Sequence, residues 1–229
     1  MKITVKALFI LLIGVISLSA NAQTYCIKGG VNMSNMLLSD ILYKDNVAYV
    51  QRVLKNNIAH VGATLDIPLT PALFFETGLL MSVKGLIIEK YYSTALNLPL
   101  HVRTRYNLYD LEVPLVAKAV LSFNDSVKIF AISGFYVGYG IAGKIKTTEQ
   151  IGDDYQSYKE NVMWGNNPDE DMLRRLDGGI SIGAGIILNC FEISASYDFG
   201  LLNLSPIENA VAKNRVIKFT FGYTFSIGK

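Results

Sequence analysis

The stretch Phe191-Glu192-Ile193-Ser194-Ala195-Ser196-Tyr197-Asp198-Phe199 alternates between apolar and polar residues without a break. A period of two is typical of a β-strand whose two faces meet different surroundings. In a helix, Glu192, Ser196 and Phe199 would share one stripe, so no face would be consistently apolar. The stretch therefore predicts a strand with one apolar and one polar face.

The same alternation recurs along the chain, although it is less regular around Gly134, Gly138 and Gly140. The recurrences are residues 25–33, 59–67, 75–83, 111–119, 127–142, 180–188 and 217–225. With residues 191–199 they predict eight strands, an even number, as in bacterial outer-membrane barrels. The predicted fold is all-β, an eight-stranded antiparallel transmembrane β-barrel.

Short and long connections alternate between these strands. The short ones are Pro68 to Ala72, Ser122 to Ser126 and Asn189-Cys190. The long ones are Met36 to Asn56, Lys84 to Thr104, Lys144 to Arg175 and Leu201 to Asn214. In an antiparallel barrel this alternation gathers the short turns at one end, which is the periplasmic end in outer-membrane barrels. Both termini are then predicted to be periplasmic.

The composition of the 229 residues excludes several classes of protein. Hydrophobic residues make up 51% and charged residues 17%, which is too apolar for a disordered chain. The formal charge of +2 gives no strong field for nucleic acid. Two cysteines cannot make a disulfide scaffold or a four-cysteine zinc site. Cys26 and Cys190 fall on non-adjacent predicted strands, so free thiols are expected.

The N-terminus has the pattern of an export signal. Lys2 and Lys6 precede the apolar run Ala7 to Leu18, and Ala20-Asn21-Ala22 supplies small residues for cleavage. Residues 1–22 are therefore predicted to be a cleaved signal peptide and residues 23–229 the barrel domain. The alternative is an uncleaved N-terminal anchor. After Gln23 no apolar run reaches the ~18 residues of a helical span.

If the barrel is surrounded by lipid, the environment of each strand face follows. The apolar face would meet lipid and the polar face would fill the interior, whereas a soluble sandwich would bury the apolar face. Aromatic residues are expected outside at both rims, where they suit headgroup level. They are Tyr25, Phe75, Phe123, Phe191, Tyr223 and Phe225 near the periplasmic rim, and Tyr109, Tyr139 and Phe199 near the outer rim.

Charged residues at inward positions predict an ion-pair network, because an unpaired charge in a narrow interior costs several kcal/mol. The network comprises Lys28, Asp66, Glu76, Glu112, Lys118, Asp198 and Lys218, with Lys128 and Glu192 also inward. The expected pairs join neighbouring strands: Lys28 with Asp66, Glu76 with Lys118, and Asp198 with Lys218. Such charges either plug so small a barrel or form a path for protons or ions.

The third long connection is the candidate recognition segment. It carries Tyr155, Tyr158 and the single tryptophan, Trp164. Aromatic residues on a loop held by a rigid scaffold suit recognition. Alternatively, the segment extends the strands or folds over the barrel mouth.

No motif for catalysis, a metal or a cofactor is found in a suitable context, so none of these is predicted. Only a loose grouping of His101 with Ser93 and Glu89 offers a hydrolase-like set.

Several short motifs resemble the PorT family of outer-membrane β-barrel proteins of Bacteroidetes-type bacteria. They are Lys28-Gly29-Gly30-Val31-Asn32-Met33-Ser34-Asn35, Phe75-Glu76-Thr77-Gly78-Leu79-Leu80 with Lys84-Gly85, Leu111-Glu112-Val113-Pro114-Leu115, and Gly222-Tyr223-Thr224-Phe225. The resemblance implies an eight-stranded barrel without shared chemistry; one type of member serves protein secretion. Residues 226–229 follow Phe225, whereas barrel proteins usually end on an aromatic residue.

The predicted function is a non-enzymatic structural or binding role at the cell surface or in secretion and assembly, exerted through the outer loops. The alternatives are a narrow pore for ions or small solutes and a lipid-modifying enzyme. The predicted partners are outer-membrane lipid and a surface or periplasmic protein, with no nucleic acid, and the chain is expected to be a monomer.

Overall fold

The computed structural model describes residues 23–39, 50–93 and 99–226, and every regular element in these ranges is a β-strand. The strands are β1 (Thr24–Leu38), β2 (Val50–Thr70), β3 (Leu73–Lys84), β4 (Leu86–Ser93), β5 (Pro99–Ser122), β6 (Val127–Ile151), β7 (Asp154–Asn161), β8 (Leu176–Leu188), β9 (Phe191–Gly200) and β10 (Ala212–Ser226). The described residues contain no helix of the length and hydropathy needed to cross a membrane. The predicted signal peptide lies outside the described residues.

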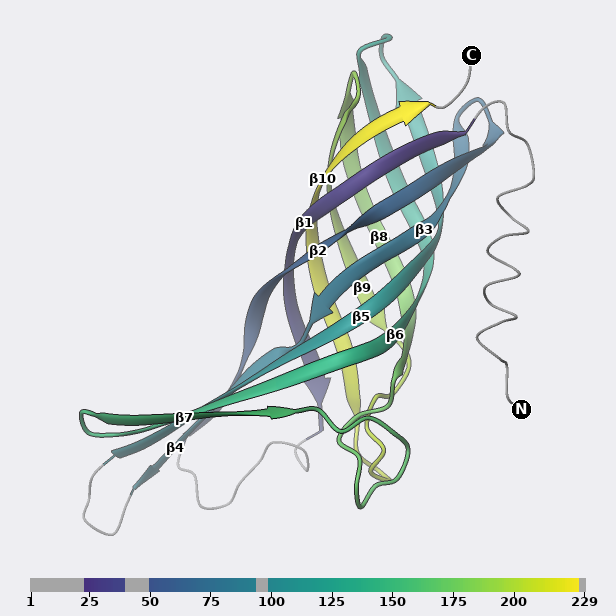
Figure 1. Ribbon diagram of the computed structural model, residues 1–229. Helices are drawn as coiled ribbons and strands as arrows, with labels where there is room; N and C mark the ends of the chain where they lie inside the picture. The colour runs from purple at the N-terminus through teal and green to yellow at the C-terminus, as the bar shows by residue number, and fades with distance from the viewer. Residues whose placement is uncertain (1–22, 40–49, 94–98, 227–229) are drawn as a thin grey trace.

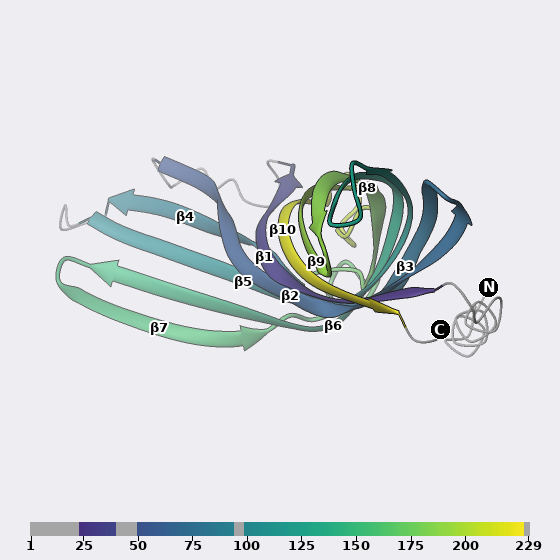
Figure 2. The same cartoon turned by 90° about the horizontal axis from the view of Figure 1, so that it is seen from above.

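Eight of the strands form a closed antiparallel ring. Its order is β1-β2-β3-β5-β6-β8-β9-β10, and β10 pairs back onto β1. Figure 2 looks along this ring. Each of the eight segments predicted from the alternation lies within one strand of the ring. The predicted all-β, eight-stranded antiparallel fold is therefore confirmed.

Three tight turns gather at one end of the ring, together with the start of β1 and the end of β10 (Figure 1). Thr70 pairs with Leu73 around Pro71-Ala72, and Leu188 pairs with Phe191 around Asn189-Cys190. Asn189 has φ of 54°, a left-handed conformation that asparagine tolerates. In the third turn, Asn124 Oδ1 accepts hydrogen bonds from the backbone N–H groups of Ser126 (2.9 Å) and Val127 (2.7 Å).

At the other end, much of what the sequence predicted as loop is strand. Residues 50–55 of β2, all of β4, residues 99–107 of β5, residues 144–151 of β6 and all of β7 form the sheet extension. Figures 1 and 2 show this extension leaving the ring to one side. The predicted loops over 36–56, 84–104 and 144–175 were therefore too long, because backbone pairing continues where the apolar alternation stops.

Gly85 allows β3 to continue into the extension as β4. Its φ of +143° is a conformation that favours glycine, and a Cβ here would lie 2.0 Å from the carbonyl oxygen of Tyr106. The Gly85 N–H donates to Ser34 Oγ at 2.8 Å. One chain segment can thus pair with β2 and β5 both inside the ring and beyond it.

The apolar faces of the ring point outward and the polar faces point inward. Ile27, Phe135 and Phe221 are more than half exposed, whereas Asn32 and Glu192 are fully buried. At the short-turn end, the rings of Tyr25 and Phe225 stack with centroids 5.9 Å apart. A soluble sandwich would reverse these faces. This arrangement instead suits a closed sheet surrounded by lipid.

Candidate functional site

A cluster of charges fills the barrel interior near the short-turn end. Lys28 Nζ lies 2.8 Å from a carboxylate oxygen of Glu76 and 2.9 Å from one of Glu192. Lys118 Nζ lies 2.9 Å from Asp66, 3.3 Å from Glu76 and 2.6 Å from Glu192. All five side chains are buried, so each ion pair is shielded from water.

A second cluster occupies the interior closer to the extension. Lys84 Nζ lies 2.8 Å from both Glu112 and Asp177, and 3.6 Å from Asp110. Lys218 Nζ lies 2.6 Å from Asp198 Oδ2 and also pairs with Glu112. Glu112 on β5 thus joins Lys84 on the neighbouring strand β3 to Lys218 on β10, the strand directly opposite β5 in the ring.

Of the predicted interior charges, all except Lys128 lie in these two clusters, and one of the three expected pairs was wrong. Glu76 contacts Lys118 and Asp198 contacts Lys218, as expected. Lys28 instead pairs with Glu76 and Glu192, and Asp66 pairs with Lys118. Alternation decides which face a residue occupies, but long lysine side chains in a narrow barrel reach beyond the neighbouring strand.

Sequence reasoning missed Lys84, Asp110 and Asp177. Lys84 had been placed at the start of a predicted loop, and Asp177 lies between the predicted loop 144–175 and the predicted strand 180–188, although both are almost fully buried. Asp110 shares the polar face of β5 with Glu112, and this parity was the signal that could have found it.

Acidic groups outnumber basic groups in the described part of the two clusters. Four lysines meet seven carboxyl groups, which are Asp66, Glu76, Asp110, Glu112, Asp177, Asp198 and Glu192. Each lysine therefore holds several carboxylates together. Loss of a lysine is expected to cost more stability than loss of one acid.

The remaining lumen between the clusters is nearly full. Tyr136 is 2% exposed and its ring lies under Lys84 Nζ, 4.5 Å from the ring centroid. His60 is held by Asn32 Oδ1 at 2.7 Å and Thr220 Oγ1 at 3.0 Å. A cavity of about 50 Å³ lies among these groups. This space suits a few water molecules rather than an open channel.

An apolar cluster closes the lumen at the end nearest the extension. We call it the apolar cap. Its buried members are Met36, Leu86, Ile88, Leu108, Ile145, Val162, Leu204 and Ala212. Trp164 and Leu173 pack against it from the segment between β7 and β8. Residues from most of the wall and from two connections thus meet over the charged interior.

The three aromatic residues of the candidate recognition segment do not share one surface. Tyr155 and Tyr158 lie on β7, are 75% and 44% exposed, and point to opposite faces because their spacing is odd. The Tyr158 hydroxyl donates to Glu149, and this hydrogen bond raises the pKa of the phenol. Trp164 packs on Gly140, where a Cβ would lie 2.6 Å from the indole ring. The segment therefore both extends the strands and folds over the barrel mouth.

The loose histidine set lies on β4 and β5 of the extension. His101 stacks on Tyr91 with ring centroids 4.4 Å apart, and its Nε2 lies 3.9 Å from Glu89. The register pairs Ser93 with Pro99 rather than with His101. Within the described residues, no group of three or more His, Cys, Asp or Glu side chains is placed to hold a metal ion.

A family model described as "Outer membrane protein beta-barrel domain" matches residues 21–205. The chain belongs to this family. Membership places the protein in the outer membrane and agrees with the outward apolar faces of the ring. Comparison with curated proteins found no match.

The chain is also similar to solved outer-membrane barrels at low identity. Ail, the attachment invasion locus protein of Yersinia pestis, is 16% identical, with 88% of this chain and 98% of that chain covered and a TM-score of 0.34. OprG from Pseudomonas aeruginosa is 12% identical, with 91% and 99% covered and a TM-score of 0.35. Neisserial surface protein A is 8% identical, with 89% and 97% covered and a TM-score of 0.39.

Proposed function

We propose that this outer-membrane barrel is a non-enzymatic binding protein that holds the sheet extension outside the cell to capture a protein partner. The observation that carries the proposal is the free edge of β7. This strand pairs with β6 on one side, and no strand of the described residues covers its other side. An uncovered strand edge presents backbone N–H and C=O groups that an extended peptide can pair with.

The rest of the extension supports this role. All eight residues of β7 are exposed, and Tyr155 adds an aromatic side chain beside the edge. Residues 144–151 of β6 support β7 along its whole length. The backbone of β7 is already ordered by its pairing with β6. Binding a partner therefore costs little conformational entropy, and more of the contact energy contributes to affinity.

The filled lumen supports binding over the alternative of a narrow pore. Two charged clusters and the apolar cap follow one another along the barrel axis. A conducting path would have to separate buried ion pairs, which costs several kcal/mol.

The proposal includes the orientation of the barrel in the membrane and its place within the outer-membrane barrel family. The short turns and both termini face the periplasm, residues 1–22 are a cleaved signal peptide, and the protein acts as a monomer. The PorT-like motifs support a place among the Bacteroidetes-type barrels that serve the cell surface or secretion. Partner capture through β7 gives that placement a concrete role.

Orientation and binding can be tested together with a cysteine at Ser157 on β7. In intact cells we expect this cysteine to react with a membrane-impermeant maleimide, whereas a matched cysteine at Asn124 in the opposite turn stays unreactive. A photo-crosslinking residue at Ser157 is expected to give one discrete protein adduct, and the same residue at Asn124 should not. Reaction only at Asn124, or no adduct from any β7 position, contradicts the proposal.

A further inference from the structure

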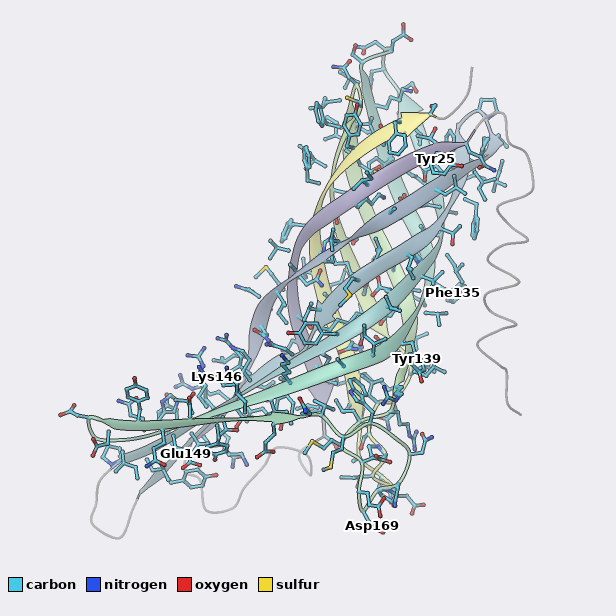
Figure 3. All side chains as sticks on the ribbon, viewed as in Figure 1. Tyr25, Phe135, Tyr139, Lys146, Glu149 and Asp169 are labelled. Atoms are coloured by element: carbon cyan, nitrogen blue, oxygen red, sulfur yellow. The ribbon has the colours of Figure 1, made fainter. Side chains whose placement is uncertain are left out.

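Cations outnumber acids on one face of the sheet extension. Cross-strand pairing assigns the faces, because residues directly opposite each other in an antiparallel pair point the same way. One face carries the cations Arg52, Arg103, Arg105, Lys144, Lys146 and Lys159, together with the acid Glu89, which lies 3.5 Å from Arg103. The other face carries the acids Glu149, Asp154 and Glu160, together with the cations Lys55 and Lys90. Figure 3 shows Lys146 and Glu149 on opposite sides of the extension.

Three of these cations stand side by side across three strands. Arg105 on β5 pairs with Lys146 on β6, and Lys146 pairs with Lys159 on β7. We call Arg105, Lys146 and Lys159 the cationic row. All three side chains are exposed, and no ion pair or side-chain hydrogen bond joins them to the described residues. Like charges directly opposite one another destabilise a sheet, so folding stability does not account for the row.

The cationic row continues the lipid-facing wall of the barrel. Arg105 and Tyr109 lie on the same outward side of β5, four residues apart. At ~3.3 Å per residue the row stands about 13 Å along the strand from the aromatic rim, or roughly 9 Å higher for a strand tilted 45°. Lipid headgroups add about 5–8 Å beyond each side of the hydrocarbon layer. The row therefore stands at or just above headgroup level.

The lean of the extension turns this face toward the membrane. Figures 1 and 3 show the extension bending away from the barrel axis, so the surface that continues the outer wall looks back along the barrel. Arg175 and Arg215 add cations on the ring at the outer aromatic rim, where each lies over an outward aromatic ring, Tyr139 at 6.0 Å and Phe199 at 5.3 Å.

We propose that the cationic row of the sheet extension binds the phosphate groups of lipid headgroups in the outer leaflet and so docks the extension on the membrane surface. This inference rests on the orientation in the proposed function. Lysine and arginine attract anionic headgroups within a Debye length. The opposite face, which carries Glu149, Asp154 and Glu160, and the free edge of β7 then remain turned toward the outside.

The test is a titration of lipid A into the protein in neutral-detergent micelles, read by native mass spectrometry. Its arms are lipid A, the same lipid without phosphates, and inorganic phosphate. We expect the preference for phosphorylated lipid A to fall roughly fivefold for each cation removed, hence about a hundredfold in R105Q/K146Q/K159Q. The charge-keeping variant R105K/K146R/K159R should bind within about twofold of the natural chain, since the attraction depends on charge at the surface.

Equal binding of the two lipids, or unchanged binding by the glutamine variant, would overturn the proposal. Displacement of lipid A by inorganic phosphate at equal concentration would also overturn it, because the row would then recognise a free anion. Heat-modifiable gel migration shows that each variant is folded. A variant lacking residues 147–158, closed by Asn-Gly, keeps Lys146 and Lys159. It should keep lipid A binding although the free edge of β7 is removed. The glutamine variant keeps Ser157 and should still give the β7 adduct, so the two proposals can fail separately.

Discussion

Lys118 Nζ on β5 lies 2.6 Å from a carboxylate oxygen of Glu192 on β9, three places away around a ring of eight strands. The contact crosses the lumen rather than joining neighbours in the wall. A barrel bridged in this way is held together by its contents as well as by its backbone pairing.

Lys118→Met is expected to destabilise the barrel by about 3–5 kcal/mol, because it leaves three buried carboxyl groups with one fewer cation. The measurement is the denaturant midpoint of heat-modifiable migration in micelles. Glu76→Gln should cost clearly less, since the cluster contains more acids than lysines. Exposed Lys55→Met is the matched control for loss of a lysine and should shift the midpoint little. Equal effects for Lys118 and Lys55 would refute the role of the cluster.

The filled lumen leads us to expect no discrete conductance steps from the purified protein in planar bilayers. Two ion-pair clusters and the apolar cap would all have to move to admit an ion. An open porin in the same membranes is the positive control. Reproducible single-channel steps that disappear in a variant with an altered lumen would restore the pore hypothesis.

Gly140→Val is expected to push Trp164 off the barrel wall, because a Cβ at this position would lie 2.6 Å from the indole ring. Trp164 is the single tryptophan, so its fluorescence reports the change directly. We expect a red shift as the ring becomes solvated. Gly29→Ala, whose Cβ would be 3.7 Å from its nearest neighbour, should leave the emission unchanged. An unshifted Gly140→Val spectrum would contradict the packing of Trp164.

Thiol labelling should distinguish the two free cysteines. Cys26 is 1% exposed, whereas Cys190 in the β8–β9 turn is partly exposed. A polar maleimide is therefore expected to label Cys190 well before Cys26 in the folded barrel, and both at similar rates after denaturation. The sites are read by peptide mass spectrometry. Prompt labelling of Cys26 in the folded protein would show that this end of the lumen is open to water.

The interior charges show how far sequence reasoning reached into the candidate site. Alternation placed Lys28, Glu76 and Lys118 on the inner face, because parity is a local property of a strand. It did not pair Lys28 with Glu192, since contacts across the lumen depend on the stagger and diameter of the closed ring. Lys84 was not predicted to point into the lumen, because the apolar alternation weakens where β3 approaches Gly85. Backbone pairing nevertheless continues through β4.

By itself, the sequence determined the eight strands of the ring, their two faces and the sharp turns, since each depends on neighbours a few residues apart. Only the tertiary structure decided the cross-lumen ion pairs, the apolar cap and the cationic row. Arg105, Lys146 and Lys159 are distant along the chain and meet because antiparallel register aligns β5, β6 and β7 beyond the ring. Register in a barrel is a property of the whole closed sheet, so no single segment of sequence reveals it.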